Sequence, residues 1–350
     1  MKKSILSMVM ASIMVFSLTA CGQETATPSG TTTPADSETS APQEDKTVTV
    51  KDATGEEVTV KVNPKRVAIY DLAILDILDT VGFDKTGIET LGLPKTESSL
   101  PDYLGEYRDN DKYVNVGTLF EADYDTLDLL QPNLIIGGGR FGSKNTEGKT
   151  IDDVKKRYPD AAYIELDIDL FVDDVEYPYE EGLKRNFDIL SQIFPELKPG
   201  LDKGITELTQ GFADIRAKSG DADTLFLMIG PGSISFYGQE GRYSLVHKEF
   251  GFKPADTTTQ ESGYHGAEVN AEYVKTENPK VILLLDRNAS LGQEGSGKEF
   301  MANSLIQETD AYKNNNIYTL DNTAWYLLTG GYTSTKNMIA DLHQYTDTLK

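Results

Sequence analysis

The sequence predicts an α/β protein of two Rossmann-like lobes, joined by a long helical connector, with a ligand cleft between the lobes. The first observation is an internal repeat, residues 123–136 and 270–283, in which a short helix, a proline and a continuous apolar run follow one another. A proline ends a helix, and a continuous apolar run is typical of a strand buried on both faces of a parallel sheet. The second observation is a stretch between the two copies whose apolar residues recur at helical spacing.

The chain begins with a predicted secretory signal peptide, residues 1–20. Lys2 and Lys3 precede an apolar stretch, residues 5–18, which is short for a helix that spans a membrane. Cys21 follows and is the single cysteine of the chain, so no intramolecular disulfide can form. Its setting resembles the bacterial lipobox, which implies lipidation of Cys21 after cleavage. The alternative is a free thiol after an ordinary signal peptide.

Residues 21–46 are rich in Thr, Ser and Pro and predict a disordered tether, with a reach of about 25–30 Å on random-coil scaling. The formal charge of the whole chain is −23, and loss of Lys2 and Lys3 with the signal peptide makes it −25. Because no basic excess is present to neutralise phosphates, nucleic-acid binding is disfavoured.

The folded part is long enough for two lobes. It divides into three predicted segments, which are an N-terminal lobe at 47–178, a helical connector at 179–218 and a C-terminal lobe at 219–350. Pro195 and Pro199 are expected to interrupt the connector. The strands and helices predicted from periodicity, beside those of the repeat, are strand 66–71, helix 72–81, helix 179–193, helix 205–218, strand 224–229, strand 233–237 and helix 243–250.

Two arginines mark the predicted cleft. Arg140 and Arg287 each lie eight residues after the proline of their repeat copy, just past the predicted strand. Ligands of α/β sheets bind at the carboxyl ends of the strands, so both side chains should face the cleft. A lone arginine after a strand is more often a solvated surface charge, but the shared offset favours the cleft.

Several short motifs together resemble the catecholate-siderophore-binding proteins of ABC importers, in the class with a helical backbone between the lobes. These motifs are Gly241–His247, Tyr264–Gly266, Leu285–Arg287, and Ala324–Leu327 with Gly330 and Gly331. The resemblance implies an extracytoplasmic, lipid-anchored solute-binding protein, a monomer without an intrinsic cofactor. Its transported ligand would be a ferric siderophore, which it delivers to an ABC permease in the membrane.

The resemblance also implies the binding residues. Three arginines of the family surround the anionic ligand, and the matching positions are Arg140, Arg242 and Arg287. A histidine and a tyrosine of the family bind iron directly, and here they are His265 and Tyr326. Iron(III) prefers oxygen donors and accepts imidazole, so these two side chains could fill the sites that a tetradentate siderophore leaves open. Arginine keeps its charge and presents fixed donors that suit catecholate oxygens.

One acidic residue lies seven positions before the proline in each repeat copy, Asp125 in the first and Glu272 in the second. In importers of this resemblance, one carboxylate per lobe docks into the permease, which makes these two acids the predicted docking residues. They could instead be ordinary acids of a first helical turn, which the helix dipole favours.

Other functions remain open at this stage. The same fold could bind haem, a cobalamin, a hydroxamate siderophore or a bare metal, although three arginines favour an anion. A phosphate-binding loop is one interpretation of the glycine run Gly137, Gly138 and Gly139. Neither a GK[ST] ending nor a G-x-G-x-x-G pattern accompanies these glycines, which disfavours that interpretation. An enzyme is disfavoured because the chain has no G-x-S-x-G, H-E-x-x-H or paired-cysteine motif.

Overall fold

The computed structural model describes residues 46–348, apart from 96–99, 142–150, 173–174 and 260–262. The predicted signal peptide, Cys21 and all of the predicted tether except Lys46 lie outside these ranges. The described residues belong to one compact unit. Among them, no helix combines the length and the apolar character that crossing a membrane requires.

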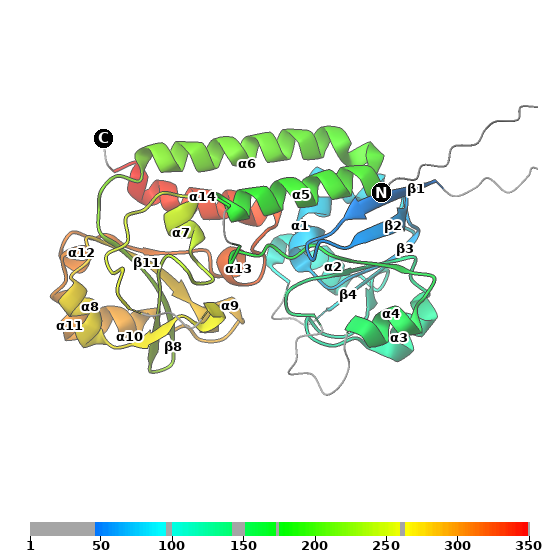
Figure 1. The fold of residues 1–350 in the computed structure, drawn as a ribbon. Coiled ribbons are helices and arrows are strands. Elements are labelled where there is room, and N and C mark those ends of the chain that lie inside the picture. The colour runs from blue at the N-terminus through cyan, green and yellow to red at the C-terminus, as the bar shows by residue number, and fades with distance from the viewer. Residues whose placement is uncertain (1–45, 96–99, 142–150, 173–174, 260–262, 349–350) are drawn as a thin grey trace, which may run out of the picture. The chain divides into compact units, whose positions relative to one another are not determined.

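Two five-stranded sheets, one in each lobe, confirm the predicted α/β class (Figure 1). The N-terminal sheet is parallel throughout, in the order β5-β4-β3-β6-β7. The strand order reverses between β3 and β6, which is where sheets of this kind bind ligands. Its strands are β3 (Arg66–Ile69), β4 (Thr90–Leu93), β5 (Val114–Asn115), β6 (Leu134–Gly137) and β7 (Ala162–Glu165).

The helices of the N-terminal lobe begin with α1 (Leu72–Gly82), which follows β3 as predicted. The predicted strand is shorter than 66–71, because Asp71 leaves the sheet to cap α1 and accepts a hydrogen bond from the Ala73 amide at 2.9 Å. The remaining helices are short, namely η1 (Phe83–Lys85), η2 (Asp102–Leu104), α2 (Gly105–Asp109), α3 (Tyr124–Leu130) and α4 (Ile151–Arg157).

The C-terminal sheet is mixed, in the order β10-β9-β8-β11-β12. The two strands predicted at 224–229 and 233–237 are present, and they form an antiparallel hairpin whose turn holds Gly232 at a φ of 65°. A hairpin in place of a crossover helix makes this half of the sheet antiparallel. The strands are β8 (Thr224–Gly230), β9 (Ser233–Tyr237), β10 (Ala267–Val269), β11 (Val281–Asp286) and β12 (Ile317–Thr319).

The helices of the C-terminal lobe are mostly single turns. The helix predicted at 243–250 is reduced to four residues, because the amides of Ser244, Val246 and His247 bond three residues back in tight turns. The helices are α7 (Leu245–Lys248), η4 (Gly263–His265), α8 (Ala271–Glu277), α9 (Arg287–Ser290), α10 (Gly297–Ala302), α11 (Ser304–Gln307), α12 (Asp310–Lys313) and α13 (Asn322–Tyr326).

The internal repeat has the same local structure in both lobes. Helices α3 and α8 are each opened by a side-chain cap, Asp123 or Asn270. Each ends at a left-handed residue directly before the proline, Gln131 at φ 47° or Asn278 at φ 43°. The left-handed residue turns the chain out of the helix, and the proline begins the approach to β6 or β11. The two acids of the repeat therefore occupy equivalent first-turn positions.

Two long helices follow the N-terminal lobe, α5 (Pro178–Ile193) and α6 (Lys198–Lys218), with a short η3 (Pro195–Leu197) between them. Helix α6 begins seven residues earlier than predicted, so Pro199 does not interrupt it. Pro199 stands in the first turn, where the missing amide hydrogen would have no helical partner in any case. Figure 1 shows α6 running along both lobes.

A second helix also spans the lobes, and the sequence did not reveal it. The C-terminal helix α14 (Tyr332–Thr346) packs against α6 and against α1 of the N-terminal lobe (Figure 1). The N-cap position of α14 provides no side-chain hydrogen bond to the helix. The buried side chain of Asp76 in α1 caps the helix instead. Asp76 accepts hydrogen bonds from the amides of Thr333 at 3.2 Å and Ser334 at 2.9 Å. The chain therefore connects the lobes through two helices.

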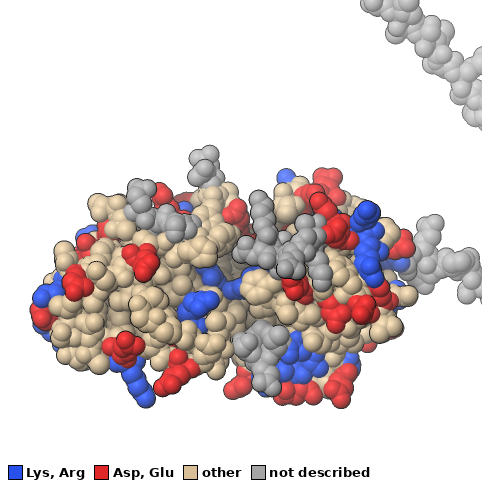
Figure 2. Space-filling model, turned by 90° about the horizontal axis from the view of Figure 1, so that it is seen from below, with Lys and Arg blue, Asp and Glu red and all other residues tan. Residues whose placement is uncertain are grey.

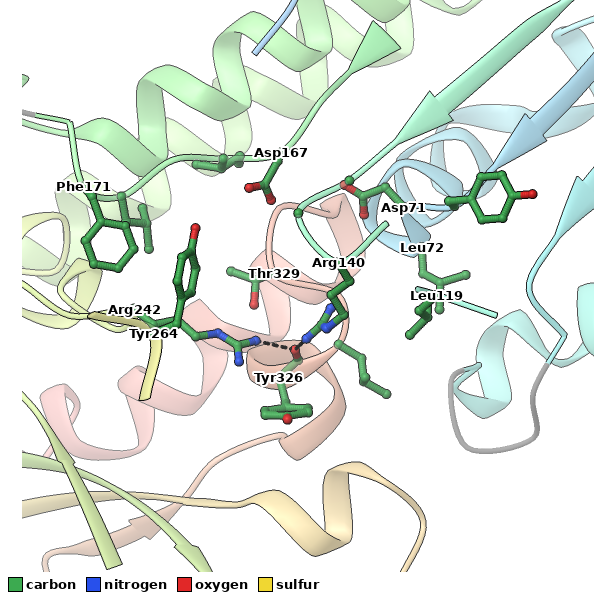
Figure 3. A pocket seen from close by; sticks show the side chains of 16 residues that line it. Asp71, Leu72, Leu119, Arg140, Asp167, Phe171, Arg242, Tyr264, Tyr326 and Thr329 are labelled. Carbon is green, nitrogen blue, oxygen red and sulfur yellow. Dashed lines mark hydrogen bonds between the residues drawn. The ribbon is translucent and has the colours of Figure 1, made fainter. Parts of the chain in front are cut away.

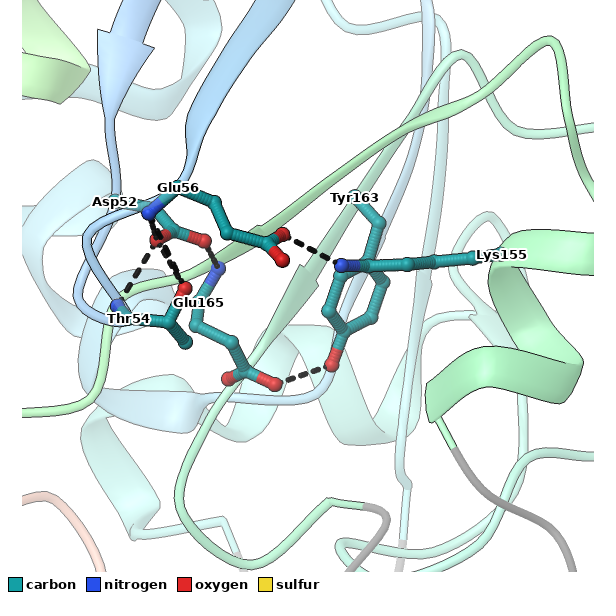
Figure 4. A network of polar contacts seen from close by, with 6 residues as sticks. All are labelled: Asp52, Thr54, Glu56, Lys155, Tyr163 and Glu165. Atoms are coloured by element: carbon teal, nitrogen blue, oxygen red, sulfur yellow. Dashed lines mark hydrogen bonds and ion pairs between the residues drawn. The ribbon is translucent and has the colours of Figure 1, made fainter.

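A two-stranded hairpin, β1 (Thr47–Lys51) and β2 (Glu57–Lys61), precedes the N-terminal sheet. Asp52 in its turn accepts a hydrogen bond from the Glu165 amide at 3.1 Å, and Glu56 pairs with Lys155 at 2.8 Å (Figure 4). The first contact holds the hairpin against the carboxyl end of β7, and the second holds it against α4.

Candidate binding cavity between the lobes

A cavity lies between the lobes, at the carboxyl ends of the N-terminal strands (Figure 3). Seen from below the view of Figure 1, basic side chains line the hollow between the two lobes (Figure 2). The residues that line the cavity are Tyr70, Asp71, Leu72, Leu119, Gly138, Gly139, Arg140, Asp167, Ile168, Leu170, Phe171, Arg242, Tyr264, Tyr326, Leu327 and Thr329. Arg140, Arg242 and Tyr326 of the predicted site are among them.

The three predicted arginines meet at one residue, Tyr326. Arg140 of the N-terminal lobe donates from Nη2 to the Tyr326 carbonyl at 2.5 Å, and Arg242 of the C-terminal lobe donates to the same oxygen at 2.7 Å (Figure 3). Tyr326 is the last residue of α13, so its carbonyl has no partner within the helix and is free to accept. The third arginine, Arg287, donates from Nε to the Tyr326 hydroxyl at 3.3 Å.

The two cavity arginines also contact the Tyr326 ring. The guanidinium carbon of Arg242 lies 4.7 Å from the ring centroid and that of Arg140 lies 5.5 Å from it, both within cation–π range. Burial lowers the pKa of the Arg140 guanidinium, and the nearby Arg242 charge lowers it further. The cavity therefore brings two like charges together, and an anion between them would relieve their repulsion.

The same charges act on the Tyr326 hydroxyl. Burial by itself would raise its pKa, but the hydrogen bond from Arg287 and the charges of all three arginines outweigh burial, and the pKa falls below its usual value. A phenol with a lowered pKa loses its proton more readily to an approaching metal ion. The arrangement therefore suits Tyr326 to bind a hard cation as a phenolate.

Local structure explains the positions of Arg140 and Arg287. Arg140 stands in a turn after β6, closed by a hydrogen bond from the Phe141 amide to the Gly138 carbonyl at 2.8 Å. Phe141 stacks on Tyr70 with 3.9 Å between the ring centroids, which fixes this turn against the sheet. Arg287 opens α9 directly after β11, is exposed, and does not line the cavity.

His265 is exposed in η4 and is not among the residues that line the cavity. Its neighbour Tyr264 does line it, so the predicted motif reaches the cavity through the tyrosine. Iron binding by His265 stays a prediction.

The sequence reasoning missed two acidic residues of the cavity, Asp71 and Asp167. Each lies two residues after the end of a strand of the N-terminal sheet, β3 or β7, and a position just past a strand is the same signal that singled out the arginines. It also missed an aromatic contact between the lobes, in which Phe171 and Tyr264 lie 4.9 Å apart between ring centroids. Both rings line the cavity and remain partly exposed, Phe171 at 37% and Tyr264 at 57%.

The predicted docking acids, Asp125 and Glu272, are exposed in the first turns of α3 and α8. Neither lines the cavity. Figure 1 shows α3 and α8 at opposite ends of the two lobes, both far from α13. One turn after Asp125, on the same face of α3, Leu129 is 87% exposed.

Comparison with known proteins agrees with this architecture. The chain belongs to the periplasmic binding protein family, whose model matches residues 67–324. It is 32% identical over 327 residues to the petrobactin-binding protein YclQ of Bacillus subtilis, covering 93% of each chain. It is 25% identical to the ferric-anguibactin-binding protein FatB of Vibrio anguillarum, covering 82% of this chain and 84% of the relative.

Comparison with solved structures also finds binding proteins of the same fold. The crystal structure of YclQ matches with a TM-score of 0.74 at 30% identity, over 87% of this chain and 99% of that one. The periplasmic catecholate-siderophore-binding protein VctP of Vibrio cholerae matches with a TM-score of 0.72 at 29% identity, over 85% of this chain and all of that one. These relatives are binding proteins, and they confirm the resemblance to siderophore-binding proteins of ABC importers.

Proposed function

We propose that this protein captures a ferric siderophore of the catecholate type outside the cytoplasm and delivers it to an ABC permease for iron uptake. The convergence of Arg140, Arg242 and Arg287 on Tyr326 is the observation that carries the proposal. The relatives named for petrobactin, anguibactin and catecholate siderophores support it.

The chemistry of such a complex fits the arginines. A tris-catecholate complex of iron(III) is a trianion, and a bis-catecholate complex is a monoanion. At an effective dielectric constant near 20, one charge pair at 4 Å gains about 4 kcal/mol before desolvation costs. Within the described part of the chain, Arg140 and Arg242 each donate one hydrogen bond, to the Tyr326 carbonyl, so other donors of each guanidinium are available to catecholate oxygens.

Tyr326 and His265 are the proposed iron ligands for a siderophore that leaves two coordination sites open. The lowered pKa of the Tyr326 hydroxyl supports its part. His265 is exposed beside Tyr264 at the edge of the cavity, so the η4 segment would have to turn its imidazole inward.

The proposal includes a lipid anchor at Cys21, a tether over residues 21–46, and action as a monomer. Cys21→Ser should release the protein from the membrane fraction into the medium and leave siderophore affinity unchanged, because the change lies outside the folded lobes. Immunoblots of both fractions test this, and retention of the variant on membranes would count against the anchor.

The proposal also includes docking to the permease through Asp125 and Glu272, one acid on each lobe. Their equivalent places on the repeat and their distance from the cavity support it. On the N-terminal lobe the exposed Leu129 would add an apolar contact beside the acid.

Binding of defined iron complexes tests the function. The chain without residues 1–20 is titrated with a ferric tris-catecholate, a ferric bis-catecholate, ferrioxamine, haem and cobalamin, with quenching of Trp325 as the signal. Trp325, the one tryptophan of the chain, is fully buried next to Tyr326. We expect sub-micromolar binding of the anionic catecholates and far weaker binding of cationic ferrioxamine. Preference for haem, cobalamin or ferrioxamine would refute the proposed ligand class.

A further inference from the structure

The cavity has an acidic side, formed by Asp71 and Asp167, which the charge of Arg140 offsets only in part. In Figure 3 the carboxylates of Asp71 and Asp167 face the cavity on one side, while the guanidinium groups of Arg140 and Arg242 meet at Tyr326 on the other. An anionic iron complex alone would be attracted by one side and repelled by the other.

The two carboxylates are held in place by the strands and loops of the N-terminal lobe. Asp71 caps α1 through its Oδ1. A β-carbon on Gly138 would lie 2.9 Å from Oδ2 of Asp71, and one on Gly139 would lie 2.6 Å from Oδ2 of Asp167. Both distances are shorter than a side chain tolerates, so glycine at these positions leaves room for the carboxylates. The glycine run is therefore explained by the space that the two carboxylates need, without a phosphate-binding loop.

A third carboxylate lies behind them. Glu165, at the end of β7, is buried and accepts a hydrogen bond from the Tyr163 hydroxyl at 2.5 Å (Figure 4). Its backbone amide is bound to Asp52, which anchors the strand that leads to Asp167. The acidic side is therefore supported by the fold and does not depend on a loose surface loop.

Within the described residues, neither the Asp71 nor the Asp167 carboxylate forms a salt bridge with a lysine or arginine side chain, although the charge of Arg140 partly offsets the rise in the pKa of both. Arg140 directs its hydrogen bond to the Tyr326 carbonyl, away from both carboxylates. Arg185 donates to the backbone carbonyl of Asp167 at 2.6 Å and to Asn186, but forms no ion pair with the Asp167 carboxylate. Carboxylates that are removed from water without a cation carry a large cost.

The electrostatics agree with this geometry. Burial and, after it, the neighbouring Asp167 raise the pKa of Asp71 to about 7, although the hydrogen bond from the Ala73 amide and the charge of Arg140 act in the opposite direction. Burial also raises the pKa of Asp167. A cation placed between the two would reverse both effects and restore the ionised forms.

We propose that Asp71 and Asp167 form a subsite for a protonated amine of the transported ligand, so that the preferred ferric siderophore carries a cationic group beside its anionic iron centre. The inference rests on the proposed function and narrows its ligand class. The arginine side holds the iron centre, and the acidic side holds the ammonium group. Ligands without the amine leave two carboxylates uncompensated and are selected against.

A matched pair of ligands tests the subsite. The first probe is the ferric complex of a bis-catecholamide whose two catechols are joined by a linear triamine with a free central nitrogen. The second is the same complex with that nitrogen acetylated, which removes the positive charge. Both are titrated into wild type, Asp71→Asn, Asp167→Asn and the double variant by quenching of Trp325. Asparagine retains the helix cap at position 71.

We expect wild type to bind the amine probe at least tenfold more tightly than the acetylated probe, the scale of a charge-assisted hydrogen bond. The double variant should lose this preference and should bind the acetylated probe more tightly than wild type does. Asp169→Asn is the matched control, because Asp169 is exposed two residues away and does not line the cavity. It should keep the wild-type preference.

Two results would overturn the inference. Equal affinity of wild type for both probes would refute the subsite and leave the proposed function intact. Failure of wild type to bind either probe would overturn the inference, and failure to bind the ferric tris-catecholate as well would refute the proposed function. If a variant does not fold, as judged by circular dichroism, the probe pair on wild type alone still decides the question.

Discussion

The two walls of the cavity differ in charge although both lobes contain the same repeated unit. The N-terminal wall presents one arginine and two carboxylates, Arg140, Asp71 and Asp167. The C-terminal lobe contributes Arg242 and Tyr326, with Arg287 bonded to the tyrosine from outside the cavity. One wall is thus suited to a ligand of mixed charge and the other to an anion.

The difference in charge between the two cavity walls follows from the path that the chain takes after each strand. In the five-stranded sheet of the N-terminal lobe all strands are parallel, so several carboxyl ends meet at one edge and bring polar residues to the cavity. In the C-terminal lobe the hairpin of β8 and β9 turns the chain back, and Arg242 enters from the turns after β9. The repeated sequence therefore gives both lobes the same helix and strand, while sheet topology decides which side chains reach the cavity.

The largest expected effect concerns docking, where the two lobes should act alike. Changing Asp125 and Glu272 together to Ala should abolish siderophore uptake by intact cells, because under the proposed docking each acid would contribute about 1–3 kcal/mol to assembly with the permease. Uptake of radiolabelled iron and affinity of the purified variant are measured side by side. Asp310→Ala, a first-turn acid of α12, serves as control. Normal uptake by the double variant would show that the docking surface lies elsewhere.

Paired changes confined to one lobe distinguish the docking contributions of the two lobes. If Leu129 adds an apolar contact, Asp125→Ala with Leu129→Ala should lower uptake more than Glu272→Ala with Thr276→Ala, since Thr276 is the polar counterpart on α8. Siderophore affinity should stay unchanged in both. Equal losses of uptake would indicate that Leu129 makes no contact with the permease.

The next effect concerns the arginines. Arg140→Ala and Arg242→Ala should each weaken binding of a ferric catecholate by about 1.5–3 kcal/mol, since each removes a charged donor from the cavity. Arg287→Ala should cost less, because its side chain is exposed and lies outside the cavity. Titration by Trp325 quenching measures all three, with Arg157→Ala, an exposed arginine paired with Asp128, as control. Unchanged affinity in both cavity variants would refute the arginine site.

The Tyr326 hydroxyl should matter for one kind of ligand only. With a ferric bis-catecholate, Tyr326→Phe should shift the visible charge-transfer band and weaken binding, because the phenolate ligand to iron is lost. With a hexadentate tris-catecholate the same change should have little effect, since iron has no open site. Absorption spectra and titrations of both complexes give the comparison. Equal effects on the two ligands would indicate that the ring only packs.

The smallest effect on transport is expected from two buried acids that attach the helices, because they act on stability and not on binding. Asp76 of the N-terminal lobe accepts hydrogen bonds from two backbone amides. Glu249 of the C-terminal lobe accepts one, from the Tyr179 amide at 2.6 Å. The second carboxylate oxygen of Glu249 has no hydrogen-bond partner among the described residues. Burial raises the pKa of Glu249 to about 7. The folded state therefore holds the proton more tightly than the unfolded state, and stability falls as the pH rises from about 4.5 through about 7.

Glu249→Gln should accordingly stabilise the protein at pH 8, by about 2–3 kcal/mol, and the gain should disappear toward pH 5. Urea unfolding at both pH values measures this. Asp188→Asn, an exposed acid on α5, is the control and should show no such pH dependence. A destabilised Gln variant at pH 8 would mean that the charged form of Glu249 is favoured in the folded state.

The sequence by itself determined the α/β class, the repeat and most element positions, because these depend on local signals. Apolar periodicity, side-chain caps such as Asp123 and Asn270, and the prolines after the helices act over a few residues. The arginines after β6 and β11 could be found in the same way, since the end of a parallel strand is predictable from its own apolar run.

Only the tertiary structure decided which of these residues meet. The contact of Arg140 and Arg242 at one carbonyl joins residues 186 and 84 positions from Tyr326. The crossing of α14 depends on Asp76, more than 250 residues before the amides that it caps. The sequence assigned no role to Asp71 or Asp167, and only the sheet order places both beside the cavity. Pairings of this kind are long-range, because they are set by how the lobes pack and by no signal within a single segment.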